Sequence, residues 1–79
     1  MNKEQVFEAV KSNVEEVLVD IDPGLITIDK SLVDLGANSV DRVEVVTMTM
    51  ETLDVKIPLI SFSHVSNIED LVDVFVKAL

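Results

Sequence analysis

Two side chains of this sequence could in principle take part in covalent chemistry, Ser39 and His64. Ser39 stands where a loop leads into a helical pattern, and His64 is the only histidine. With an aspartate they could form a Ser-His-Asp triad, but nothing in the sequence supplies an oxyanion hole or a substrate cleft. We therefore predict a protein without catalytic residues and expect His64 to lie on the surface.

The residue types present do not support metal binding or thiol chemistry. The chain has no cysteine, so it has no thiolate ligand, no thiol nucleophile and no disulfide. Residues 20–24, Asp-Ile-Asp-Pro-Gly, hint at a calcium loop. However, Pro23 and Gly24 replace the third oxygen ligand, and Ser31 stands at the twelfth position, where the motif needs glutamate. We expect an ordinary turn there and no bound metal.

Ser39 is placed where a modification would be accessible. Asn38 or Ser39 itself is a suitable N-cap, and Asp41 adds negative charge to the first helical turn. A phosphate ester on Ser39 would lie beside free backbone N–H groups and the positive end of the helix dipole. Gly36 would permit close approach by another protein's backbone. These residues alone leave open whether Ser39 is an ordinary cap or an attachment site.

The elements that must position Ser39 follow from the hydrophobic spacing. Apolar residues recur at helical intervals in residues 3–19, 39–53 and 68–78, with acidic residues between them. Residues 20–38 form a long connection, and residues 59–66 could hold one short helical turn. We predict an all-α fold with a single domain over residues 1–79. It is a small four-helix bundle of three main helices plus a short third helix, with a long loop between the first and second helices.

The helix predicted over residues 39–53 has two faces. One is apolar and should pack into the bundle; it consists of Val43, Val46, Met50 and Leu53. The other mixes carboxylates with apolar side chains; it consists of Asp41, Glu44, Val45, Met48 and Glu51. We expect this second face to be exposed and to dock on basic patches of other proteins, with Val45 and Met48 adding an apolar contact. A merely solvated surface is the alternative.

The bulk composition restricts the partners. The 79 residues are 48% hydrophobic, which suffices for one packed domain. Six basic residues stand against fifteen acidic ones, a net charge of −9, which argues against nucleic acid and against anionic membrane surfaces. No stretch reaches the ~18 apolar residues of a membrane span, and the first residues do not look like a signal peptide. We expect a soluble, cytoplasmic protein.

Residues 32–44, Leu-Val-Asp-Leu-Gly-Ala-Asn-Ser-Val-Asp-Arg-Val-Glu, resemble the signature of acyl carrier proteins. That family typically reads Leu-Gly-Ala-Asp-Ser-Leu, with Val-Glu a few residues later. The resemblance continues without a gap through Glu51, Leu53, Ile57-Pro58 and the Asn-Ile-Glu-Asp-Leu run at residues 67–71. It covers most of the chain from residue 32 onwards and rests on several spaced elements.

The resemblance implies a non-catalytic carrier with a four-helix fold. The family serine, matched by Ser39, receives 4′-phosphopantetheine from coenzyme A through a magnesium-dependent phosphopantetheinyl transferase. Acyl groups are then attached to the arm as thioesters and are delivered to acyltransferases, ketosynthases or HMG-synthase-like enzymes. These partners would contact the helix that follows the serine; the expected contact residues are Asn38, Val40, Asp41, Glu44, Val45, Met48 and Glu51. A monomer is expected, because the arm must move between enzymes.

Four departures from the family pattern bear on the pathway. Asn38 replaces the usual Asp, Val40 replaces the usual Leu, and Arg42 puts a positive charge on a usually acidic helix. Residues 59–64 are apolar where fatty-acid carriers are acidic. These features favour a discrete carrier of polyketide or related biosynthesis, with an acetyl donor for HMG-synthase-type β-branching as one hypothesis. The alternatives are a general fatty-acid carrier and an acidic helical adaptor with no prosthetic group.

Overall fold

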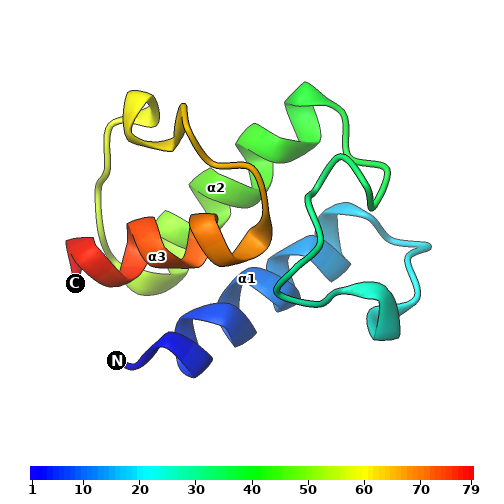
Figure 1. Ribbon diagram of the computed structural model, residues 1–79, viewed down its shortest axis with the longest axis horizontal. Helices are drawn as coiled ribbons and strands as arrows, with labels where there is room; N and C mark the ends of the chain where they lie inside the picture. The colour runs from blue at the N-terminus through cyan, green and yellow to red at the C-terminus, as the bar shows by residue number, and fades with distance from the viewer.

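The computed structural model describes residues 1–79 and consists of helices and loops (Figure 1). The α-helices are α1 (Lys3–Val17), α2 (Ser39–Leu53) and α3 (Ile68–Ala78), and two 3₁₀ helices lie in the connections, η1 (Pro23–Leu25) and η2 (Leu59–Phe62). The all-α prediction is confirmed, and the bounds of α2 and α3 agree with it. The short third helix is the 3₁₀ turn η2, and α1 ends at Val17, two residues earlier than predicted. No helix is long and apolar enough to cross a bilayer.

Each α-helix begins at an asparagine whose side chain caps it. The side-chain oxygens of Asn2, Asn38 and Asn67 each accept a hydrogen bond of 2.8 Å from the backbone N–H three residues later. Such a cap satisfies one of the backbone donors that a helix start leaves without an intrahelical partner. Local sequence therefore fixes where all three helices start.

The core lies where α1 packs against both α2 and α3. Phe75 of α3 is its largest fully buried side chain, and its ring lies 5.4 Å from that of Phe62 in η2, measured between centroids. The core comprises thirteen buried apolar residues: Val6, Val10, Val14, Ile26, Leu32, Ala37, Val45, Val46, Leu53, Ile68, Leu71, Val72 and Phe75. Aliphatic burial from all three helices and the long loop therefore holds the chain together.

The long loop over residues 18–38 contacts the helices at several points. Ile26, Leu32 and Ala37 are buried in the core. Two loop carbonyls, of Ile28 and Lys30, accept hydrogen bonds from the first backbone N–H groups of α3, at 2.9 and 2.8 Å. The loop therefore satisfies the open end of α3 while carrying the chain from the end of α1 to the start of α2.

The predicted division of α2 into faces is wrong at Val45. That side chain is 0% exposed, whereas Val43, expected inside, is 48% exposed. The reason is that α2 packs against α1 on the side of Thr49, which lies one helical turn after Val45. Buried Asn13 of α1 donates a hydrogen bond from Nδ2 to Thr49 Oγ1 at 3.0 Å. Burial on this side turns Val43 towards the surface, while Val46 and Leu53 remain buried as predicted.

Candidate functional site

Ser39 is the first residue of α2 and its side chain is exposed. Its hydroxyl is not used to cap the helix, because Asn38 does this. Asn38 Oδ1 accepts from the Asp41 N–H at 2.8 Å, and Asp41 Oδ2 accepts from the Asn38 N–H at 3.1 Å. This reciprocal pair is a capping box. The Ser39 hydroxyl is left without an intramolecular hydrogen bond and is open to modification.

The backbone around Ser39 suits an attached phosphate group. The N–H groups of Ser39 and Val40 make no hydrogen bond within the protein, because they lie in the first turn of α2. Together with the positive end of the helix dipole they favour an anion at this place. The residues present therefore fit a phosphodiester on Ser39 Oγ, which would lie clear of the core.

Gly36 shapes the approach to Ser39 through its backbone conformation. Its φ is +93°, a region that residues with a Cβ rarely adopt, although an added Cβ would meet no atom within 4 Å. Directly after it, the Ala37 N–H donates to the Leu32 carbonyl at 3.0 Å and the Ala37 side chain is buried. The chain therefore reverses its direction just before α2, and this turn is a structural reason for glycine at position 36. It is separate from the close approach by another protein's backbone that the sequence led us to expect.

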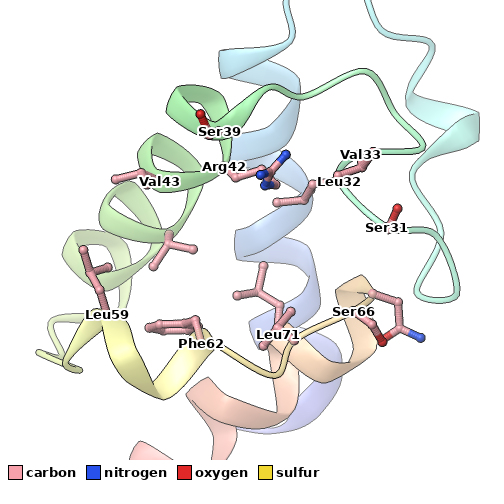
Figure 2. A pocket seen from close by; sticks show the side chains of 13 residues that line it. Ser31, Leu32, Val33, Ser39, Arg42, Val43, Leu59, Phe62, Ser66 and Leu71 are labelled. Carbon is pink, nitrogen blue, oxygen red and sulfur yellow. The ribbon is translucent and has the colours of Figure 1, made fainter.

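A cavity of about 440 Å³ opens beside Ser39 (Figure 2). Side chains from α2, η2, α3 and the loop converge on it. The thirteen lining residues, eight of them hydrophobic, are Ser31, Leu32, Val33, Ser39, Arg42, Val43, Val46, Leu59, Phe62, Val65, Ser66, Asn67 and Leu71. Its volume falls within the ~300–1,000 Å³ of typical small-molecule sites. The cavity could take an apolar chain that enters from the Ser39 end.

The sequence identified only part of this lining. Of the four residues that the sequence assigns to the inward face of α2, Val43 and Val46 line the cavity, whereas Met50 and Leu53 do not. Helix α1 contributes no residue to it. Instead the wall is completed by Leu59 and Phe62 of η2 and by loop residues. The sequence shows this part of the wall as the apolar segment 59–64, but spacing along the chain does not reveal that the segment packs against α3 and lines the cavity.

The residues expected to contact partners lie in different environments. Asn38, Val40, Glu44 and Glu51 are exposed, with Val40 reaching 71%. Asp41 and Met48 are half-buried, and Asp41 is engaged in the capping box. Val45 is fully buried and cannot serve as a surface contact. The exposed surface of α2 is therefore acidic, with one strongly exposed valine next to Ser39.

The other residues considered for chemistry, His64 and residues 20–24, do not line the cavity. His64 is exposed, as expected. No group of three or more His, Cys, Asp or Glu side chains is close enough to hold a metal ion. The Asp22 side chain caps η1 by accepting from the Gly24 N–H at 2.9 Å, so residues 20–24 form the turn expected from Pro23 and Gly24.

Comparison with known proteins identifies the family. Residues 8–75 match the family model described as "Phosphopantetheine attachment site". The chain is 45% identical over 74 residues to "Polyketide biosynthesis acyl-carrier-protein AcpK" of Bacillus subtilis (strain 168), covering 94% of this chain and 90% of that protein. It is 35% identical over 74 residues to "Acyl carrier protein" of Guillardia theta, covering 92% of this chain and 90% of that protein. It is 40% identical over 68 residues to "Acyl carrier protein" of Phenylobacterium zucineum (strain HLK1), covering 85% of each.

No solved structure gave a significant match. The family model spans most of the chain, and these relatives are covered over nearly their whole length. The exposed serine at a helix start and the adjoining apolar cavity suit a covalently attached arm. The chain therefore belongs to the acyl carrier proteins, and its prosthetic group is a covalently attached 4′-phosphopantetheine.

Proposed function

We propose that Ser39 carries the 4′-phosphopantetheine arm and that the protein is a non-catalytic acyl carrier of polyketide biosynthesis. The observation that carries the proposal is the state of the Ser39 hydroxyl. It is exposed, it makes no intramolecular hydrogen bond, and Asn38 has taken over the capping of α2. Modification of Ser39 would therefore break no hydrogen bond that holds the fold.

The chain's own residues would then hold and present the arm. The free N–H groups of Ser39 and Val40 would face the phosphodiester, since they lack intramolecular partners. The arm supplies a terminal thiol to which acyl groups are attached as thioesters. The chain itself has no cysteine and therefore no thiol. The cavity beside Ser39 would shelter apolar parts of the cargo, because most of its lining is aliphatic or aromatic.

The exposed face of α2 would guide the carrier to its enzymes. Glu44 and Glu51 are exposed along α2, Asp41 lies half-buried at its start, and Val40 offers an apolar contact beside Ser39. Such a surface complements basic patches and raises the rate of encounter with them. As in the family generally, the partners are a phosphopantetheinyl transferase and the biosynthetic enzymes that load and use the acyl group. We expect this to take place in the cytoplasm.

The pathway is supported by the relative that is 45% identical over nearly the whole chain and whose name places it in polyketide biosynthesis. The exposed apolar residues Leu59 and Ile60 next to the cavity fit a carrier whose partners differ from those of fatty-acid carriers. A general fatty-acid carrier is the alternative, since other relatives are named simply as acyl carrier proteins.

The decisive experiment measures the intact mass of the protein after incubation with coenzyme A, magnesium and a promiscuous phosphopantetheinyl transferase. Wild type should gain one phosphopantetheine, Ser39→Ala should gain none, and Ser63→Ala, which removes an exposed hydroxyl near η2, should behave as wild type. If the wild type stays unmodified with several transferases, the carrier proposal fails and an adaptor function takes its place. A gain of mass by Ser39→Ala would move the attachment to another residue.

The finer proposal is that the loaded carrier donates acetyl groups to an HMG-synthase-like enzyme for β-branching. This proposal is based on the differences from the usual acyl-carrier-protein pattern at Asn38, Val40 and residues 59–64. The test supplies acetyl-loaded protein separately to such a synthase and to a fatty-acid elongation system, and follows the loss of the acetyl group by mass spectrometry. Transfer only to the synthase supports the donor role, whereas normal feeding of elongation alone would refute it.

A further inference from the structure

Arg42 is the one charged side chain that lines the cavity beside Ser39. We propose that its guanidinium binds the phosphodiester that joins the prosthetic arm to Ser39. This contact would hold the attached end of the arm at the opening of the cavity. This inference rests on the proposed attachment to Ser39 and adds a positioning residue to it.

The geometry of α2 brings Arg42 to Ser39. Residues three apart on an α-helix are neighbours on one face, and long helical side chains lean towards the helix N-terminus. Arg42 follows this rule, since its Nη1 donates to the carbonyl of Ala37, two residues before Ser39, at 3.2 Å. Figure 2 shows the guanidinium reaching from α2 towards Leu32 in the loop, one turn from Ser39. The guanidinium therefore lies level with the start of α2, where the phosphodiester would be attached.

The charge of Arg42 has no partner in the protein. The ion pairs of the structure, to Glu69 and Asp73, both involve Lys3. Arg42 is half-buried beside an apolar cavity, yet only its bond to the Ala37 carbonyl occupies any of its five N–H donors. A half-buried cation without a counter-ion favours a nearby anion more strongly than an exposed one does.

The surrounding sequence makes this cation distinctive. Arg42 is the only basic residue between residues 31 and 55, in a chain of net charge −9. A guanidinium presents paired donors that match two phosphate oxygens, whereas the ammonium group of lysine acts as a point charge. A phosphodiester stays anionic at all physiological pH values, so the contact would persist in the unloaded and the acylated carrier. The contact would aim the arm along the cavity wall instead of into solvent.

The test uses nuclear magnetic resonance on apo and holo protein of confirmed mass. In the wild type, the Arg42 Nε–Hε signal should shift when the arm is attached, and the shift should shrink as salt is raised. The phosphorus signal of the holo protein should move in Arg42→Gln. It should stay in place in Lys56→Gln, which removes the same charge from an exposed loop residue, and Arg42→Lys should give an intermediate position.

The outcomes separate this inference from the attachment itself. If Ser39 gains no mass, the proposed function has failed. If the mass is gained but neither the Arg42 signal nor the phosphorus signal responds, only the role of Arg42 is overturned. A response of Arg42 that appears solely with a carboxylated acyl group would assign Arg42 to the cargo and also overturn the inference. The apo-to-holo comparison needs no variant, so a loss of stability in Arg42→Gln cannot obscure the result.

Discussion

Asn38 and Asp41 cap α2 reciprocally: each side chain accepts the other's backbone N–H, at 2.8 and 3.1 Å. Ser39 lies between them in the chain, yet its hydroxyl takes no part in the cap. The start of α2 is therefore held by two residues that flank the site proposed for modification. This arrangement separates the stability of the helix from the chemistry at Ser39.

Asn38→Ala should lower the free energy of unfolding of the apo protein by about 1 kcal/mol, because it removes the N-cap acceptor. Asn38→Asp should keep most of the stability, since a carboxylate caps as well and is favoured near the positive end of the helix dipole. Urea denaturation followed by circular dichroism measures both. Equal midpoints for Asn38→Ala and the wild type would show that the cap does not stabilise α2.

Thr49→Val should cost about 1–3 kcal/mol of stability, because it leaves buried Asn13 without its closer acceptor. Thr52 Oγ1, at 3.3 Å from Asn13 Nδ2, can compensate only in part. The matched control is Thr47→Val, because the hydroxyl of Thr47 makes only an exposed hydrogen bond, to the Glu44 carbonyl of its own helix. It should change stability by no more than about 0.5 kcal/mol. Similar losses in both variants would rule out a special role for the Asn13–Thr49 pair.

Val45→Ala should destabilise the protein by about 2 kcal/mol, the loss of two buried carbon atoms plus a residual cavity. Val43→Ala should cost much less, because Val43 is 48% exposed and Val45 is fully buried. Thermal or chemical unfolding of the two apo variants provides the comparison. The opposite ranking would support the faces predicted from sequence over those in the structure.

Replacing both Glu44 and Glu51 by lysine should lower kcat/KM with a basic partner such as the transferase by about tenfold at low salt, since steering by complementary charge is reversed. The control replaces Glu8 and Glu16 of α1, which are also exposed, and so makes the same change in net charge. Its effect should be much smaller. If both double variants lose the same activity, the net charge and not the α2 face governs docking.

Stability should fall in acid in part through Asp70. Hydrogen bonds from the Ser66 hydroxyl at 2.8 Å and the Ser66 backbone N–H at 3.1 Å lower the pKa of this carboxyl below its ordinary value. Because the folded pKa lies below the unfolded one, the contribution is complete above about pH 4 and is lost as pH falls through the folded pKa.

Ser66→Ala should therefore be less stable than the wild type at pH 6, and the gap should narrow towards pH 2.5. Urea midpoints measured across this range for wild type, Ser66→Ala and the control Ser63→Ala test the assignment. A gap between wild type and Ser66→Ala that is independent of pH would mean that the hydroxyl stabilises the loop without affecting Asp70.

The sequence by itself determined the local features of this protein. Helical spacing of apolar residues and the asparagines at residues 2, 38 and 67 define where the three helices begin, because capping depends on residues only three positions apart. The pattern around Ser39 likewise pointed to the family that the comparisons show. These properties are set by neighbours in the chain and need no knowledge of the fold.

Only the tertiary structure decided which side of α2 faces inwards and where the cavity opens. Valines at 43, 45 and 46 are equivalent by residue type, and a helix packed between two neighbours can bury more than one face. Thr49 accepts a hydrogen bond from Asn13, thirty-six residues away in the chain. Val45, one turn before Thr49, is fully buried, whereas Val43 is 48% exposed and lines the cavity. The packing of η2 against α3 and the hydrogen bond from Arg42 to the Ala37 carbonyl also depend on contacts that hydrophobic periodicity does not contain.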